Sequence, residues 1–217
     1  MSAPKYKLVY FNGTGRAQSI RLTFAAGGVP FEDSRVGYPE FQALCADKAK
    51  CPLQCLPLLF ADDRLIGGNS HCIRHFAARL AHLTHEDPMD NLRIDEVEYA
   101  TDELLSLHYK CMFERDAEKK KVNTHEFHTS GFQHYAAYIE SILARGAASN
   151  QFITATLSQA DIFLFCVLQY VRKFAVDENA ISVDATTLLA GYPRILALES
   201  AVKSVPAIAA AIVTYPF

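Results

Sequence analysis

The chain has 217 residues, of which 50% are hydrophobic and 21% are charged, as in ordinary soluble globular proteins, and this length suffices for one large domain or two small ones. The formal net charge of -3 argues against a dominant role in binding nucleic acid or an anionic membrane. No segment approaches the roughly 20 apolar residues that span a bilayer, and Met1–Lys5 lacks an apolar signal core. The sequence therefore predicts a cytoplasmic protein.

The chain contains six cysteines, which we expect to be reduced thiols because there is no secretory signal. Cys45, Cys51 and Cys55 lie close together in the sequence, and Cys72 follows His71. Their spacing matches neither a C-x-x-C pair nor a zinc-finger pattern. We therefore interpret them as small buried apolar residues and expect no metal site.

The first 82 residues predict a small α+β layer of the order βαβ, then a β-hairpin, then a helix. β-Branched and aromatic runs predict the strands, and apolar residues at helical spacing predict the helices. Gly27-Gly28 ends the first helix, and Asp62-Asp63 marks the hairpin turn. The expected strands are residues 6–11, 31–36, 56–60 and 64–66, and the expected helices are residues 16–26 and 70–82. Residues 39–48 are expected to form a short helix or an irregular segment.

Beyond a polar, proline-containing linker at residues 83–89, the strand signal disappears and residues 90–217 predict an all-helical domain. The stretch from Ile162 to Val171 is apolar on nearly all sides, so we expect it to be the buried centre of that domain. Ser158 and Asp161 have the spacing of a capping box just before it. The run Lys119-Lys120-Lys121 is interpreted as a solvated helix end or loop.

The tract from Lys7 to Arg16 carries the strongest functional signal from the residues themselves. A buried strand ends in Tyr10, a turn containing Gly13 and Gly15 follows, and a helix then begins. A phenol beside a helix N-terminus can donate a hydrogen bond to an anion held there. The structural alternative is that Tyr10 is a strand-end aromatic that packs against Phe11.

Two further tracts allow both a functional and a structural interpretation. Pro57 opens a strand although it cannot donate to a sheet ladder, and it could equally be an ordinary turn proline. Asn69 and Ser70 begin a helix, where either one could simply cap the helix or the N-terminus could bind a carboxylate.

Taken together and in this order, the tracts resemble cytosolic glutathione transferases of the tyrosine type, nearest the sigma class and related to the pi, mu and alpha classes. The resemblance covers essentially the whole chain and implies a thioredoxin-like N-terminal domain followed by the helical domain. The matching tracts are Tyr10-Phe11 with Gly15-Arg16-Ala17, Leu56-Pro57-Leu58-Leu59, Asn69-Ser70 with Ile73-Arg74, Ser158-Gln159-Ala160-Asp161-Ile162, Tyr192-Pro193 and Val205-Pro206.

The resemblance implies a role for each residue of a glutathione site. Tyr10 would be catalytic, because a phenol that donates to sulfur favours the reactive thiolate. A cis Pro57 would follow Leu56, whose main chain would pair with the cysteinyl part of glutathione. The other implied glutathione-binding residues are Phe11, Arg16, Lys48, Gln54, Asn69 and Ser70, although Arg16 and Lys48 could instead be surface charges.

The resemblance also implies a homodimer whose site lies near the interface, glutathione as co-substrate with no permanently bound cofactor, and a hydrophobic electrophile as second substrate. The partner subunit would supply an acidic residue near Tyr99, with Glu98 and Asp102 as candidates. The candidates for contact with the second substrate are Asn12, Gly13, Thr14, Leu104, His108, Met112 and Phe217.

This chain departs from the family pattern where glutathione's two carboxylates would bind. It has no tryptophan, so Phe41 or Gln42 stands where several classes hold the glycyl carboxylate with one. Asn69 replaces the usual glutamine, Gln54-Cys55 replaces the usual Gly-Gln, and Leu53 stands at the aromatic key of some dimer interfaces.

The leading functional hypothesis is conjugation of glutathione to apolar electrophiles in detoxification, with peroxide reduction or prostaglandin-type isomerisation as side activities. The departures leave two alternatives open. One is a non-enzymatic structural or ligand-binding relative such as a lens crystallin. The other is a transferase for a modified glutathione whose glycyl carboxylate is an amide.

Overall fold

The computed structural model of the chain describes residues 4–147, 149–175 and 188–217, so residues 1–3 of the N-terminal stretch considered above lie outside it. The chain divides into two compact units, Met1–Thr84 with Val205–Phe217, and His85–Ser204. The division falls in the predicted linker region. The observed units differ from the expected domains in one respect: the C-terminal segment Val205–Phe217 groups with the first unit and not with the helical one.

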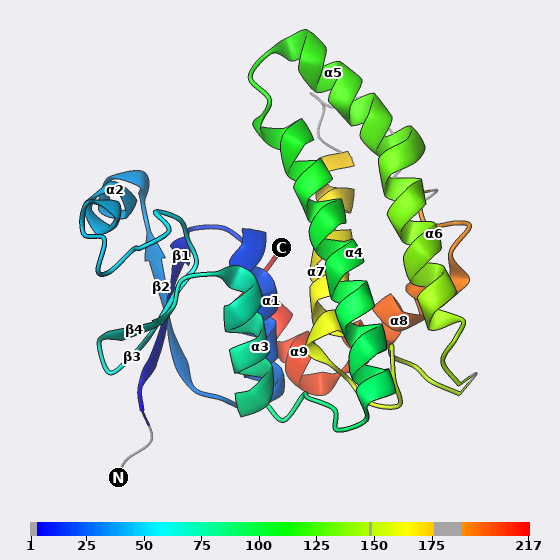
Figure 1. Ribbon diagram of the computed structural model, residues 1–217, viewed down its shortest axis with the longest axis horizontal. Coiled ribbons are helices and arrows are strands. Elements are labelled where there is room, and N and C mark those ends of the chain that lie inside the picture. The colour runs from blue at the N-terminus through cyan, green and yellow to red at the C-terminus, as the bar shows by residue number, and fades with distance from the viewer. Residues whose placement is uncertain (1–3, 148, 176–187) are drawn as a thin grey trace. The chain divides into compact units, whose positions relative to one another are not determined.

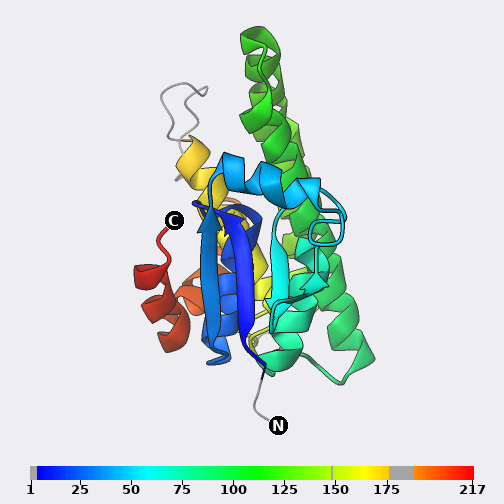
Figure 2. The ribbon, with the colours of Figure 1, turned by 90° about the vertical axis from the view of Figure 1, so that its left-hand side faces the viewer.

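The first unit is built on a four-stranded mixed sheet in the order β2-β1-β3-β4 (Figure 2), as the sequence predicts. β1 and β2 pair in parallel with Tyr6 opposite Phe31, while β1 pairs antiparallel with β3, Val9 lying opposite Leu58. β3 and β4 form the predicted hairpin. The strands are β1 (Tyr6–Phe11), β2 (Phe31–Val36), β3 (Leu58–Ala61) and β4 (Arg64–Gly67).

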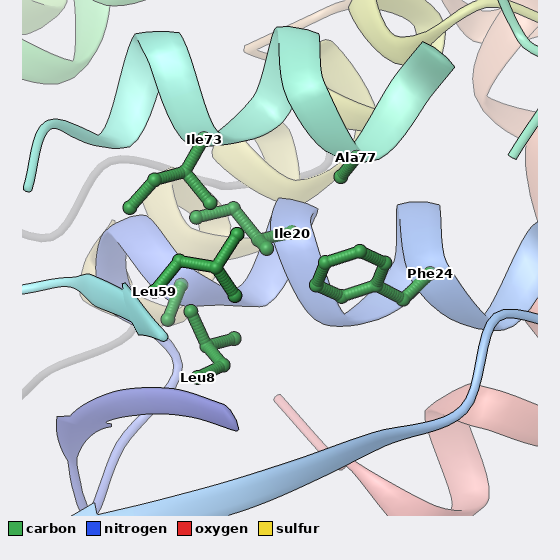
Figure 3. Close-up of a cluster of buried hydrophobic side chains, with 7 residues drawn as sticks. Leu8, Ile20, Phe24, Leu59, Ile73 and Ala77 are labelled. Atoms are coloured by element: carbon green, nitrogen blue, oxygen red, sulfur yellow. The ribbon is translucent and has the colours of Figure 1, made fainter. Parts of the chain in front are cut away.

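Alternation along the strands gives each face of the sheet its own core. Leu8 and Leu59 point to the face that α1 and α3 cover, where they meet Ile20, Phe24 and Ile73 (Figure 3). On the other face a second cluster includes Val9, Leu58 and Phe60 together with side chains of α2. The helices of this unit are η1 (Gly15–Ala17), α1 (Gln18–Ala26), α2 (Tyr38–Ala46), α3 (Ser70–Leu80) and α9 (Pro206–Thr214).

The C-terminal segment groups with the first unit because α9 packs on α1. The Gln18 side chain donates from Nε2 to the Tyr215 carbonyl oxygen at 2.6 Å. The Tyr215 ring also lies 5.9 Å from the Phe31 ring. α1 is thereby enclosed, which explains why its residues from Gln18 to Phe24 are all buried.

Helices are the only regular secondary structure in the described residues of the second unit, as predicted, and α4 packs against both α6 and α7 (Figure 1). Every residue from Ala160 to Leu168 of α7 is buried, which confirms the predicted central helix. The helices are α4 (Pro88–Phe113), α5 (Ala117–Glu126), the π-helical η2 (Phe127–Gly131), α6 (Phe132–Leu143), α7 (Gln159–Ala175) and α8 (Pro193–Ser204). No single helix among the described residues is both long and apolar enough to span a bilayer.

The predicted capping box forms at the start of α7. Asp161 Oδ2 accepts hydrogen bonds from the Ser158 main-chain N–H at 2.8 Å and from the Ser158 hydroxyl at 2.6 Å. Asp161 Oδ1 accepts from the Ile153 N–H at 2.8 Å. Burial raises the pKa of Asp161 to about 6, and the hydrogen bonds from Ser158 and Ile153 oppose this rise. The carboxylate is therefore ionised at neutral pH and ties the preceding loop to the buried helix.

Three local features differ from the sequence expectations. The strand expected from Leu56 begins at Leu58, since the prolyl nitrogen of Pro57 carries no hydrogen for the ladder. The lysine run at residues 119–121 lies within α5, which Asp116 caps. Residues 127–131 form a π-helical turn that the helical spacing did not predict.

Candidate functional site

Tyr10 ends strand β1 with its phenol against the turn that follows. The phenolic oxygen accepts a hydrogen bond from the Arg16 main-chain N–H at 3.1 Å. Gly15 has a φ of +40°, and a Cβ at this position would lie 2.4 Å from the Tyr10 oxygen. Only glycine therefore allows this close approach. A hydroxyl that accepts from the main chain still has its own hydrogen to donate, as activation of a bound thiolate requires.

Arg21 is the residue that organises this turn, and the sequence analysis did not identify it. Its side chain is fully buried in α1, with Nε 2.9 Å from Asp33 Oδ1 and Nη1 2.8 Å from the Gly13 carbonyl oxygen. The guanidinium carbon lies 5.9 Å from the centre of the Tyr10 ring. Burial lowers the pKa of Arg21, and Asp33 acts in the opposite direction. The sequence signal that could have identified it is an arginine among the apolar residues of α1, where a charged side chain needs a buried partner.

A second arginine fixes the start of the same turn. Arg35 donates from Nε to Asp33 Oδ2 at 2.9 Å and from Nη1 to Asn12 Oδ1 at 3.2 Å. Asp33 thus links Arg21 with Arg35, and the turn is held from both sides. Asn12 and Gly13 are two of the turn residues expected to contact a second substrate. Asn12 Oδ1 accepts from Arg35 and the Gly13 carbonyl oxygen accepts from Arg21, while both residues remain exposed.

The segment before β3 has the geometry that the resemblance implies. The Leu56–Pro57 peptide bond is cis, and both residues are buried. Just before them, Gln54 has a φ of +50° and is exposed, with its N–H bonded to the Cys51 carbonyl oxygen at 3.0 Å. Among the described residues, the structure records no hydrogen bond to the Leu56 main chain.

The start of α3 divides its roles between two residues. Asn69 is the N-cap: its Oδ1 accepts from the His71 and Cys72 N–H groups at 2.9 and 3.2 Å. Ser70 is the first residue of the helix and is buried. Its N–H and hydroxyl are the donors that the cap does not use. The structural interpretation of this tract therefore holds for Asn69, and Ser70 stays the candidate for binding a carboxylate.

Ser70 supplies the sharpest test of carboxylate binding at this helix. We expect Ser70→Ala to raise the KM for glutathione about three- to tenfold with little change in kcat, because one hydrogen bond to a charged group is lost. Steady-state kinetics with varied glutathione would measure this. Ser19→Ala is the matched control, since it removes a buried hydroxyl from the same unit. Equal KM values for the Ser70 variant and the unmodified protein would contradict the assignment.

The two basic candidates for the glycyl carboxylate lie in different surroundings. Arg16 is half-buried in η1. Burial and Cys51 raise the pKa of the Cys55 thiol, and the positive charge of Arg16 opposes this rise. Lys48 is exposed in the turn after α2. Phe41, which stands where several classes have a tryptophan, packs edge-on against Phe11 with ring centres 5.0 Å apart. This position is therefore part of a core cluster.

The helical candidates differ in accessibility. Leu104 and His108 are buried, whereas Met112 is half-buried. The His108 ring lies 5.6 Å from Phe127 and 5.1 Å from Tyr170, so it is part of the packing of the helical unit and offers no surface to a ligand. Phe217 is half-buried.

The two acidic candidates across the dimer also differ. Glu98 is only 1% exposed, while Asp102 is half-buried. Of these two residues, Asp102 is the more accessible.

His108 makes the stability of the chain depend on pH. Burial, together with the charge of His128, lowers the pKa of His108 from 6.5 to about 4. Unfolding exposes the imidazole, so the unfolded chain binds a proton that the folded chain does not. This part of the stability is present above pH 6.5 and is lost as the pH falls toward 4. The shift corresponds to roughly 3 kcal/mol.

We therefore expect His108→Phe to unfold with a shallower dependence on pH than the unmodified protein. Urea midpoints between pH 7 and pH 4.5 would measure the difference. His125→Phe, at an exposed histidine of the same unit, should leave the slope unchanged. Parallel slopes for His108→Phe and the unmodified protein would show that His108 does not titrate in this way.

Comparison with known proteins identifies the family. Residues 102–213 match the model for the C-terminal domain of glutathione S-transferases. S-crystallin SL11 of Nototodarus sloanii is 31% identical over 208 residues and 95% of each chain. The chain therefore belongs to the glutathione S-transferase family.

The particular relatives support the predicted sigma-like class. The hematopoietic prostaglandin D synthase of Gallus gallus is 26% identical, over 95% of this chain and 94% of the relative. Prostaglandin synthase D of Nilaparvata lugens has the same fold, with a TM-score of 0.82 at 23% identity over 99% and 100% of the two chains. A glutathione S-transferase of Ascaris lumbricoides has a TM-score of 0.81 at 24% identity over 99% and 98%.

Proposed function

We propose that this protein is a cytoplasmic glutathione transferase that conjugates the thiol of glutathione to hydrophobic electrophiles in detoxification. The observation that carries the proposal is the Tyr10 phenol, which accepts from the Arg16 N–H at 3.1 Å and keeps its own hydrogen. The chain belongs to the glutathione S-transferases, whose co-substrate is glutathione, and we therefore propose that the Tyr10 phenol acts on the glutathione thiol.

In the proposed complex, three parts of the first unit bind glutathione. Ser70 at the start of α3 receives the γ-glutamyl carboxylate, because its N–H and hydroxyl are not used by the Asn69 cap. The Leu56 main chain pairs with the cysteinyl residue, in the manner of an added strand. Lys48 and Arg16 are proposed for the glycyl carboxylate.

The reaction itself needs a thiolate, which is scarce at neutral pH because a free thiol has a pKa of about 8.5. The Tyr10 hydroxyl donates a hydrogen bond to the sulfur and so favours the thiolate, while the thiol proton passes to solvent. The sulfur then forms a bond to the electrophilic carbon, and the leaving group departs with its electron pair. Arg21 acts indirectly, by holding the turn against which the phenol lies.

We expect Tyr10→Phe to lower kcat for conjugation of glutathione to a chromogenic aryl halide by about 10- to 100-fold, because a charge-assisted hydrogen bond to sulfur is lost. The KM for glutathione should change less. Tyr6→Phe is the matched control, since it removes a hydroxyl from the same strand. An undiminished kcat in Tyr10→Phe would remove the phenol from the mechanism.

The alternative is a non-enzymatic protein, which the similarity to S-crystallin SL11 favours. It predicts that the purified chain neither binds to immobilised glutathione nor conjugates any of several electrophiles. Hydroperoxides and a prostaglandin endoperoxide belong in the same screen, because relatives include prostaglandin D synthases. Comparing KM for glutathione with that for its glycyl amide would test the modified-thiol alternative.

We also propose a homodimer, as is typical of the family. Met89, Leu92 and Tyr99 are exposed apolar residues of α4, and their spacing places them on one face of the helix. Leu53 is likewise exposed. Sedimentation velocity would distinguish a dimer from the 24.1 kDa monomer.

A further inference from the structure

Two thiols face each other shortly before Leu56 and Pro57 in the first unit. Cys45 lies in the last turn of α2 and Cys51 lies six residues later, with their sulfur atoms 3.6 Å apart. Cys51 is fully buried and Cys45 is half-buried. A disulfide needs a sulfur separation of about 2.05 Å, so a shift of roughly 1.5 Å would suffice. Between the two cysteines the chain leaves α2 after Ala46, and residues 48–50 form a turn.

We propose that Cys45 and Cys51 are a redox modification site, which oxidised glutathione converts into a reversible intramolecular disulfide. The choice of oxidant rests on the proposed function, since the site next to this pair would bind glutathione. The exposure of the two sulfurs sets the order of the steps: Cys45 reacts first because it is the more accessible, and buried Cys51 resolves the intermediate.

The chemistry is balanced without a further reactant. The Cys45 thiolate attacks one sulfur of oxidised glutathione, the glutathione disulfide bond breaks, and one glutathione leaves as a thiol after taking up a proton. The Cys51 thiolate then attacks the Cys45 sulfur of this mixed disulfide, and the second glutathione leaves. Two protein thiols are oxidised, and one oxidised glutathione is reduced to two molecules of glutathione.

The other nearby cysteine presents its main-chain carbonyl oxygen to the Cys51 sulfur. Cys55 is exposed, and its sulfur lies 4.0 Å from the Gly68 carbonyl oxygen, whereas the Cys51 sulfur lies 3.6 Å from the Cys55 carbonyl oxygen. Cys51 therefore contacts the sulfur of Cys45 but the main chain of Cys55. Oxidation by the proposed route should link residues 45 and 51.

Oxidation also changes the segment that leads to Leu56. The Cys51 S–H donates to the Cys55 carbonyl oxygen, and a disulfide removes that hydrogen. The next residue is Leu56, whose main chain is proposed to pair with glutathione. We expect the oxidised protein to have a KM for glutathione about three- to tenfold higher, as the loss of one hydrogen bond from the binding segment would produce.

The experiment is mass spectrometry of the purified full chain after incubation with oxidised glutathione at pH 7.0 and pH 8.5. Burial and the hydrogen bond with Cys51 raise the pKa of Cys45, so the reaction should be faster at pH 8.5. The expected product has lost two hydrogens, contains a peptide link between Cys45 and Cys51, and returns to the starting mass with dithiothreitol.

Single variants separate the two thiols. Cys51→Ala should stop at the mixed disulfide, retaining one glutathionyl group on Cys45, while Cys45→Ser should form neither product at this pair. Cys72→Ser, at an exposed cysteine outside the pair, is the matched control and should still form the link. These masses do not depend on catalysis, so loss of the proposed transferase activity would leave this test intact.

Two outcomes would overturn the proposal. One is a protein in which Cys45 and Cys51 remain reduced at pH 8.5 while Cys72 becomes glutathionylated. The other is a link that joins Cys55, rather than Cys45, to Cys51. If the link forms but the KM for glutathione is the same before and after reduction, the regulatory consequence is wrong.

Discussion

Asp161→Ala should destabilise the protein by about 3–5 kcal/mol, because it deprives buried donors of their acceptor. The Ser158 N–H and hydroxyl and the Ile153 N–H all donate to this one carboxylate. An alanine leaves these buried groups without a partner where water cannot replace it. The loss also uncouples the loop at residue 153 from the helix that forms the centre of the second unit.

Urea unfolding followed by circular dichroism would measure the Asp161 effect. Asp161→Asn should be nearly as harmful, since an amide nitrogen would face donors where one carboxylate oxygen now accepts. Asp95→Ala is the matched control, because Asp95 is an exposed acidic residue of the same unit, and such changes usually stay within about 0.5 kcal/mol. A loss below 1 kcal/mol in Asp161→Ala would mean that these bonds are replaced by others.

The second large effect is expected at Arg21. Arg21→Met removes one member of a buried ion pair and leaves Asp33 Oδ1 and the Gly13 carbonyl without their donor. Breaking a buried pair in this way typically costs about 3–5 kcal/mol. Because the same guanidinium holds the turn beside Tyr10, protein that remains folded should also show a reduced kcat for conjugation.

Two comparisons make the Arg21 prediction specific. Arg21→Lys keeps the charge but loses the planar fork of donors, so it should destabilise the protein less than Arg21→Met. Asp33→Asn should cost less stability when it is added to Arg21→Met than when it is made alone, because the Arg21–Asp33 interaction is then already lost, although Arg35 loses Asp33 in both cases. Denaturant midpoints of the unmodified protein, of Arg21→Met, Arg21→Lys and Asp33→Asn, and of the double variant would measure both. Strictly additive losses would refute the direct coupling of Arg21 to Asp33.

Local patterns predicted most of the fold because they record burial directly. The β-branched and aromatic run at residues 6–11 predicted the first strand, and the apolar run from Ile162 predicted the central helix. The capping box at Ser158 was equally local. The π-helical turn at residues 127–131 was missed because a single wide turn does not disturb helical spacing over a short window.

The site was predictable only in part, for reasons of distance and orientation. Tyr10, Pro57 and Ser70 stand in short recognisable tracts. Arg21 acts through Asp33, twelve residues away and on another element, and no local pattern indicates that pairing. The face of α4 that carries His108 was also ambiguous, because α4 has buried and exposed residues along its whole length.

The return of Val205–Phe217 to the first unit has a consequence for biosynthesis. A ribosome makes the sheet and α1 first, but the α9 helix that covers α1 is made only after the helical unit. The nascent N-terminal unit therefore keeps an apolar helix surface open while the whole helical unit is being translated. A stop codon just before Pro206 would leave that surface permanently uncovered. Loss of α9 would therefore destabilise mainly the N-terminal unit.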